Sequence, residues 1–170
     1  RSMQVYREAP VLTAQPSDAD QARVPHLLYG HVSAREVYSV GRWRGDAAQA
    51  LEEARAMKRV PIFVGGTGMY FKALLRGLSD IPAVPDEVRA RVRTEAEGLS
   101  PPELHARLMA LDPATAAGLR PSDPQRILRA LEVFEATGEP LVSFQNRPGT
   151  PLLDPQTARG FFLAPERAAL

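Results

Sequence analysis

Apolar residues recur at helical spacing in several separate stretches of the chain, and each stretch predicts an amphipathic helix. Residues 46–57 carry one apolar stripe: Ala47, Ala50, Leu51, Ala54 and Met57. Similar patterns follow in residues 86–98, 100–112 and 123–137. In the last of these, Asp123 suits an N-cap, Pro124 the first helical position and Gly138 the C′ position.

Two short apolar runs predict buried strands instead. Residues 59–64 (RVPIFV) follow a predicted helix and lead into glycines and another helical pattern, and residues 160–165 (GFFLAP) predict a returning strand. Helix, strand, Gly-rich turn and helix in succession are typical of a parallel α/β layer. Residues 139–160 hold four prolines and predict a loop between the helical stretches and the second run.

Composition narrows the class of protein. The chain has 170 residues, of which 44% are apolar, and its net charge of +1 does not by itself indicate a polyanion binder. It holds no cysteine, which excludes disulfides and thiolate chemistry, and no apolar run is long enough for a membrane helix. We therefore expect a cytoplasmic protein with no membrane partner.

The sharpest local feature is the sequence Gly65-Gly66-Thr67-Gly68, between the predicted strand and the next helix. Free backbone N–H groups at such a junction, with the Thr67 hydroxyl, favour an anion. A tight turn without a ligand would need the same glycines, so both interpretations stay open. The P-loop pattern G-x-x-x-x-G-K-[ST] is absent from the chain.

Arginines gather on two of the predicted helices. Gln125, Arg129 and Glu132 share one face, with Arg126 beside them, and this arrangement indicates a phosphate or carboxylate partner. The alternative is a solvated face on which Arg129 pairs with Glu132 or Asp123. Another set of arginines is offset by neighbouring carboxylates and predicts a mixed surface: Arg89, Arg91 and Arg93.

Other candidate groups are less specific. Trp43 lies between Arg42 and Arg44, where it could stack on a base, but an anchoring role at the edge of the core is the preferred interpretation. The histidines His26, His31 and His105 have no metal-ligand spacing, so we predict no metal site on them.

Taken in order, several short blocks of the sequence resemble one family, the tRNA dimethylallyltransferases, also called tRNA isopentenyltransferases. The blocks are SMQVYR, TAQP, VPHLL, YSVGRWRGDA, VPIFVGGTGMYFKALLRGL, VPDEVRARV and SDPQRILRALEVFEATG. The resemblance implies an α/β core with a parallel sheet like that of P-loop NTPases, and an inserted helical lobe. It also implies a nucleotide-binding, ATP-binding class of protein. Residues 1–80 would belong to the core, 81–145 to a tRNA-binding insertion, and 146–170 to a loop and strand that return to the core.

The same resemblance implies a reaction and its partners. A dimethylallyl group would pass from dimethylallyl diphosphate to the exocyclic amine of the adenosine next to the anticodon, with Mg²⁺ assisting departure of the diphosphate. The partner would be a tRNA anticodon stem-loop, and the enzyme a monomer. Catalysis would rest on positioning a flipped-out base and stabilising the leaving group.

Site residues follow from the matching motifs. Ser2, Met3 and Gln4 match the segment that recognises the target adenosine, and Thr67 matches the threonine that lies against tRNA. Thr67 is also the one candidate catalytic side chain. Gly65 and Gly66 would lie near the phosphates. The implied tRNA contacts of the insertion are Arg89, Gln125, Arg126, Ile127, Leu128 and Arg129.

Two departures from the family pattern matter. The family has an aspartate before Ser-x-Gln as its proposed general base, whereas this chain has Arg1, whose guanidinium stays protonated at neutral pH. The family's P-loop and C-terminal segment are also not found, and we expect the metal ligands outside this chain. We therefore interpret the chain as an internal portion of such an enzyme that is inactive alone.

Two other functions remain open. An isopentenyltransferase acting on free adenine nucleotides (adenylate) would share the core, but it would not need arginine-bearing helices at 86–98 and 123–137. A non-catalytic RNA-binding remnant would keep salt-sensitive binding without transfer.

Overall fold

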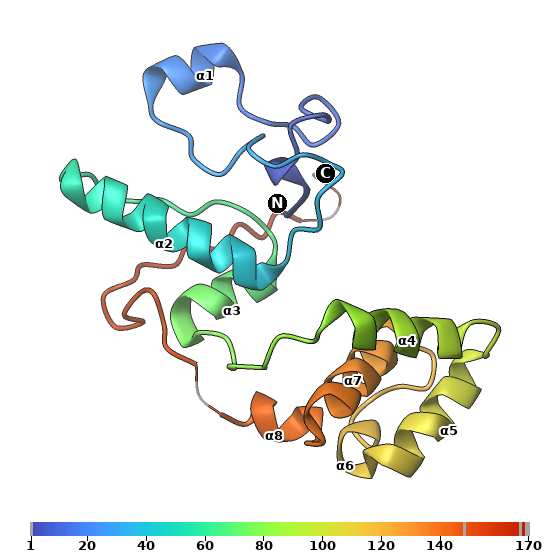
Figure 1. Cartoon of the computed structure of the whole chain (residues 1–170). Helices are drawn as coiled ribbons and strands as arrows, with labels where there is room; N and C mark the ends of the chain where they lie inside the picture. The colour runs from blue at the N-terminus through green and yellow to red at the C-terminus, as the bar shows by residue number, and fades with distance from the viewer. Residues whose placement is uncertain (1, 148, 167, 169–170) are drawn as a thin grey trace. The chain divides into compact units, whose positions relative to one another are not determined.

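The structure, a computed structural model, describes residues 2–147, 149–166 and 168. Figure 1 labels its α-helices, which follow a short 3-10 helix, η1. The helices are η1 (Ser2–Val5), α1 (Asp18–Arg23), α2 (Val40–Ala56), α3 (Gly68–Arg76), α4 (Asp86–Ala96), α5 (Pro101–Leu111), α6 (Pro113–Ala116), α7 (Pro124–Thr137) and α8 (Leu141–Gln145).

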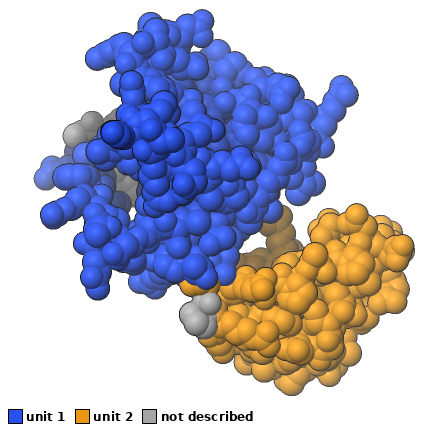
Figure 2. All heavy atoms as spheres, turned by 60° about the vertical axis from the view of Figure 1, so that its left-hand side comes forward, with its two compact units in different colours: residues 1–78, 150–170 blue, residues 79–149 orange. Residues whose placement is uncertain are grey.

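The chain divides into two compact units, shown in different colours in Figure 2. Unit 1 contains Arg1–Leu78 and Thr150–Leu170, and unit 2 contains Ser79–Gly149. The boundaries predicted from the sequence lie after residues 80 and 145. The role of unit 2 as a tRNA-binding insertion stays a prediction at this point.

The helices of unit 2 begin and end where local chemistry dictates. The Asp123 carboxylate accepts a hydrogen bond from the Arg126 N–H at 3.2 Å, and Pro124 opens α7. Gly138 ends the helix in the left-handed conformation (φ 70°, ψ 3°), which costs a residue without a Cβ little. Ser100 and Glu103 form a capping box at the start of α5. The predicted start and end of α7 are therefore confirmed.

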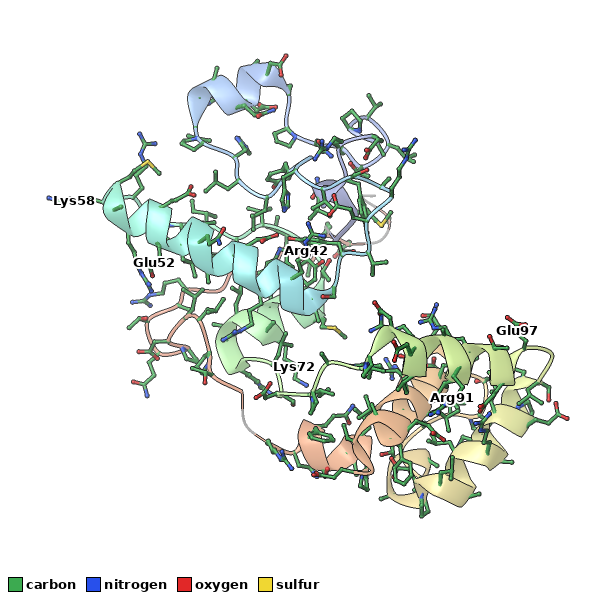
Figure 3. All side chains as sticks on the ribbon, viewed as in Figure 1. Arg42, Glu52, Lys58, Lys72, Arg91 and Glu97 are labelled. Atoms are coloured by element: carbon green, nitrogen blue, oxygen red, sulfur yellow. The ribbon has the colours of Figure 1, made fainter. Side chains whose placement is uncertain are left out.

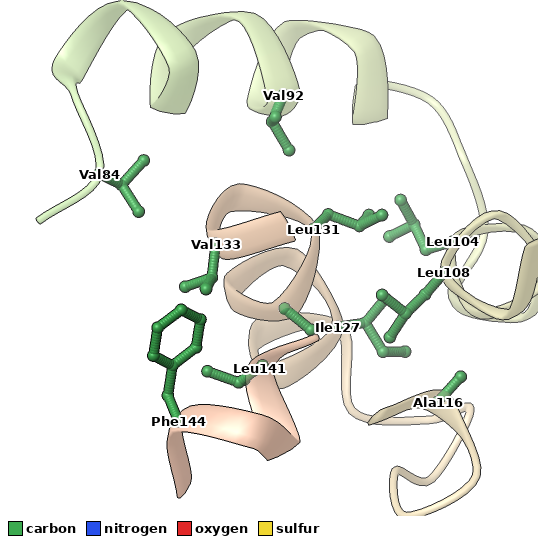
Figure 4. Close-up of a cluster of buried hydrophobic side chains, with 11 residues drawn as sticks. Val84, Val92, Leu104, Leu108, Ala116, Ile127, Leu131, Val133, Leu141 and Phe144 are labelled. Carbon is green, nitrogen blue, oxygen red and sulfur yellow. The ribbon is translucent and has the colours of Figure 1, made fainter. Parts of the chain in front are cut away.

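Unit 2 has its own apolar core, in which α7 packs against both α4 and α5. Val92 points from α4 toward α7, and Leu104 and Leu108 of α5 meet it from another side (Figure 4). Ile127 of α7 is fully buried in this core. Ile127 was predicted as a tRNA contact, but its side chain is not available to a partner.

A buried carboxylate links three elements of unit 2. Asp112 is fully buried at the point where α5 ends and α6 begins. Its Oδ1 accepts a hydrogen bond from the Thr115 N–H at 2.9 Å, and its Oδ2 accepts one from the Leu141 N–H at 3.1 Å. Because Leu141 is the first residue of α8, Asp112 fixes α8 against the end of α5.

Unit 1 is organised around α2 and α3. Trp43, only 6% exposed, stacks on Tyr70 with ring centroids 4.1 Å apart and meets Phe63 edge to face at 6.4 Å. Val5 and Val32 are buried in the same cluster. The preferred interpretation of Trp43 as a core anchor is therefore confirmed.

The predicted parallel sheet is not seen in the residues that the structure describes. They contain no β-strand, and the nearest feature is one isolated parallel bridge between Tyr6 and Val32. The run at 59–64 lies along α2 without strand pairing (Figure 1), and its Val60 and Ile62 are 86% and 82% exposed. Phe161 in the second run is 93% exposed. A strand forms only when a neighbour supplies its ladder hydrogen bonds, and here none lies alongside.

Two further expectations change. Residues 139–160 are not wholly a loop, because α8 begins directly after Pro140. The helix predicted at 46–57 begins earlier, at Val40, where the Ser39 hydroxyl accepts a hydrogen bond from the Arg42 N–H at 3.2 Å. Among the described residues, no helix is long and apolar enough to cross a membrane.

The role of Asp112 can be tested by substitution. Asp112→Ala leaves two buried N–H groups without an acceptor, so we expect it to lower the free energy of unfolding by about 3 kcal/mol. Urea unfolding followed by circular dichroism measures the change. Asp123→Ala is the matched control, since it removes a less buried cap worth about 1 kcal/mol. Equal losses in the two variants would contradict the linking role of Asp112.

Candidate nucleic-acid interface

The start of the chain and the Gly-rich turn meet in unit 1. The Ser2 backbone N–H donates a hydrogen bond to the Thr67 hydroxyl at 3.2 Å, across 65 positions of sequence. Thr67 is the N-cap residue of α3, but its side chain makes no capping hydrogen bond. The hydroxyl is therefore used to hold the first segment. Segment 2–4 and Thr67, both predicted to contact tRNA, are thus brought together, with the predicted phosphate-proximal Gly65 and Gly66 directly before Thr67.

The residues beside this contact are held by backbone-directed bonds. The Gln4 side-chain amide donates to the Ala14 carbonyl at 2.8 Å, and Gln15 donates to the carbonyls of Gln4 and Tyr6 at 3.0 and 2.8 Å. Met3, in contrast, is 59% exposed. The segment is thus fixed through its backbone while one side chain points to solvent.

A pocket of about 560 Å³ lies next to the same junction. Its wall is largely apolar and comes from the loop at 24–29, the run at 59–65, and helices α2 and α3. Gln4, Thr67 and Gly65 also line it. A pocket of this kind accepts an apolar group or the face of a ring. Among the described residues, no carboxylate lines it.

The arginines of unit 2 are partly paired. Arg126, at the start of α7, pairs with Asp123 at 3.3 Å and keeps 73% of its side chain exposed. Arg89 of α4 pairs with Asp86 at 2.9 Å. Such exposed pairs contribute about 0 to 1 kcal/mol to stability, so an anionic partner can compete for either guanidinium.

Glu132 is the residue that the sequence pattern misplaces. It was assigned to the polar face of its helix, yet its side chain is only 4% exposed. Its Oε1 accepts a hydrogen bond from Arg93 Nε at 3.0 Å, and its Oε2 lies 3.7 Å from Arg129 Nη1. The predicted pairing of Arg129 with Glu132 is thus present, and Arg93 of α4 shares the same carboxylate.

The remaining predicted contacts of α7 differ in exposure. Gln125 is exposed, and Leu128 is half-buried and packs against the core of unit 2. The helix therefore offers Gln125, Arg126 and Arg129 to a partner. Arg1, noted for its place in the motif, lies outside the described residues.

A polar cluster that the sequence did not indicate lies near the start of α2. The Tyr38 hydroxyl donates to Asp46 Oδ2 at 2.6 Å, and His31 Nε2 lies 3.2 Å from the same oxygen. Burial favours the neutral acid, but hydrogen bonds from Tyr38 and His31 outweigh it and lower the pKa of Asp46. Burial and the hydrogen bond to Asp46 together raise the pKa of Tyr38.

Mg²⁺ needs several oxygen ligands gathered at one place. Within the described part of the chain, no group of three or more His, Cys, Asp or Glu side chains could hold a metal ion. The described residues therefore do not fit a divalent cation.

The model of the IPP transferase family matches residues 4–170. The chain belongs to this family. One relative, from Methylocella silvestris, is named a tRNA dimethylallyltransferase. It is 59% identical to this chain over 99% of this chain and 56% of its own length. One from Azorhizobium caulinodans, with the same name, is 54% identical over 99% of this chain and 54% of its own. The chain thus spans about half the length of the curated relatives it matches.

A solved structure agrees with this membership of the IPP transferase family. A eukaryotic dimethylallyltransferase acting on tRNA superposes with a TM-score of 0.70 and 26% sequence identity, over 89% of this chain and 38% of that one.

The pKa of Asp46 gives a pH-dependent prediction. A carboxylate whose pKa is lowered on folding contributes stability above its unfolded pKa of about 3.9, and that contribution is lost as the pH falls through the folded pKa. We expect Asp46→Asn to lower the free energy of unfolding by about 1 kcal/mol at pH 7. Below about pH 4 the variant and the wild type should converge. Urea unfolding at a series of pH values measures this, and a constant difference down to pH 3 would contradict it.

Proposed function

We propose that this chain belongs to a tRNA dimethylallyltransferase, and that the activity is that of the full-length enzyme and not of these 170 residues alone. The enzyme joins the exocyclic nitrogen of the adenosine beside the anticodon to C1 of the dimethylallyl group, while the C–O bond to diphosphate breaks. The nitrogen loses one proton, and diphosphate leaves with the electron pair of the broken bond. The observation that carries the proposal is the Ser2–Thr67 contact, which unites two segments that match the family's tRNA-recognising motifs.

The two units have different parts in this proposal. The junction in unit 1, with the apolar pocket beside it, receives the target base, because a largely apolar wall suits an unstacked ring. The arginines of α4 and α7 in unit 2 contact the phosphates of the anticodon stem-loop. Both helices belong to one packed core, so these arginines stand on a rigid support.

The finer fold is part of the same proposal. We assign the exposed apolar runs at 59–64 and 160–165 to the parallel sheet of a P-loop NTPase-like core. Support comes from their β-type sequences and from the exposure of Val60 and Phe161, which a neighbouring strand would cover.

Binding of RNA by this chain tests the interface. We expect an anticodon stem-loop to bind with an affinity that falls steeply with salt, and Arg126→Ala to weaken the binding about threefold to tenfold. Fluorescence anisotropy with a labelled stem-loop measures both. Arg55→Ala is the matched control, because Arg55 also pairs with a carboxylate three positions away but lies in unit 1. Equal losses in both variants would contradict the assignment.

The choice of substrate is tested by competition. An excess of free AMP should not displace the stem-loop, because AMP offers one phosphate where the arginine-bearing helices require several. Displacement by AMP at concentrations similar to those of unlabelled stem-loop would favour the transferase that acts on free adenine nucleotides.

The chemical step has its own prediction. We expect this chain alone to transfer no label from radioactive dimethylallyl diphosphate to the stem-loop, because no carboxylate lines the pocket to accept the proton. The full-length relative from Methylocella silvestris serves as the positive control. Measurable transfer by the 170-residue chain would show that this account of the pocket is wrong.

A further inference from the structure

We propose that Glu132 is a positioning residue that holds Arg93 and Arg129 together as one phosphate-binding pair for the RNA backbone. The inference rests on the proposed function and deepens it. It adds Arg93, from α4, to the contact surface of α7, and it gives a buried acidic residue a part in binding an acidic partner.

The geometry around the carboxylate is the first argument. Each oxygen of Glu132 faces a different guanidinium: Oε1 lies 3.0 Å from Arg93 Nε and Oε2 lies 3.7 Å from Arg129 Nη1. Arg93 belongs to α4 and Arg129 to α7. One carboxylate thus accepts a hydrogen bond from Arg93 and lies within ion-pair distance of Arg129, which belongs to the other helix.

Burial and charge are the second argument. The Glu132 side chain is 4% exposed, whereas those of Arg93 and Arg129 are 63% and 41% exposed. A partner therefore reaches the two cations but not the anion beneath them. Two positive charges against one negative leave a net charge of +1 at the surface, so the site attracts an anion.

The donors that remain are the third argument. Arg93 donates a hydrogen bond to Glu132 through Nε, and its two terminal amino groups have no hydrogen-bond partner among the described residues. Terminal amino groups in this fork geometry match the oxygens of a phosphate. Holding the guanidinium through Nε reduces the entropy that Arg93 loses when it binds.

A second ion pair between the same helices shows the contrast. Arg91, labelled on α4 in Figure 3, donates to Glu135 of α7 at 3.0 Å. Glu135 is 29% exposed, so its negative charge remains open to solvent. This pair joins α4 to α7 without creating a cationic surface, and it provides a matched control.

The sign of one substitution separates this inference from simpler explanations. Glu132→Gln removes a negative charge, so by charge alone RNA should bind more tightly. If the carboxylate only stabilised the helix packing, affinity would stay unchanged in the folded variant. A positioning role predicts weaker binding of RNA, because both arginines lose the carboxylate that they share.

The experiment measures binding of a labelled anticodon stem-loop to the whole 170-residue chain by fluorescence anisotropy over a series of salt concentrations. We expect Glu132→Gln to weaken binding about fivefold, and Glu135→Gln to change it less than twofold. Arg93→Ala should weaken binding and reduce the slope of log affinity against log salt by about 1. Because Arg93 is well exposed, that variant tests the site even where Glu132→Gln does not fold.

Coupling completes the test. In an Arg93→Ala/Arg129→Ala background, Glu132→Gln should cause no further loss, since it acts only through these two arginines. Circular dichroism and urea unfolding confirm that each variant compared is folded.

The possible results are distinct. Unchanged or tighter binding by folded Glu132→Gln, or an unchanged salt slope in Arg93→Ala, would overturn the inference and leave the proposed function standing. No binding of the stem-loop by the wild-type chain would overturn both. Weaker binding by Glu132→Gln, with little change in Glu135→Gln, supports the positioning role.

Discussion

The carboxylate of Asp112 lies fully buried where α5 ends and α6 begins, with two backbone N–H groups as its partners. A buried carboxylate is costly unless its oxygens are satisfied, and here each oxygen accepts one hydrogen bond. One of these bonds comes from the first residue of α8, which packs against α7. This link fixes α8 against the end of α5, and α7, which carries the arginines, packs against α4, α5 and α8.

Glu132 shows a different use of a buried acid. Its partners are side chains rather than backbone groups, and those side chains reach the surface while the carboxylate does not. Asp112 therefore organises the fold of unit 2, whereas Glu132 organises the charge that unit 2 presents. In unit 1 the Ser2–Thr67 hydrogen bond links the first segment to the Gly-rich turn.

The sequence predicted those features whose causes are local. Asp123 and Gly138 mark the ends of α7 because a cap and a left-handed residue act over a few positions. Whether the runs at 59–64 and 160–165 form strands could not be predicted from local signals. A strand needs a neighbouring strand to pair with, and sequence spacing does not reveal that neighbour.

The sequence identified several residues of the candidate site, but it did not show which of them lie together in the fold. Ser2 and Thr67 were identified by motif resemblance, but a contact across 65 positions needs the fold to be seen. Glu132 was placed on a polar face by the helical period, and its burial depends on packing against α4. The available signal was that its neighbours Ala130, Leu131 and Val133 are all apolar.

The central claim is that one RNA contacts both the Ser2–Thr67 junction and the arginine face of unit 2. Photo-crosslinking with an anticodon stem-loop that carries 4-thiouridine, followed by mass spectrometry of the linked peptides, tests this directly. The account predicts links in peptides that cover residues 2–4 or 65–67 and in peptides from α4 or α7. Links confined to α1 and α2, with none in α4 or α7, would contradict it.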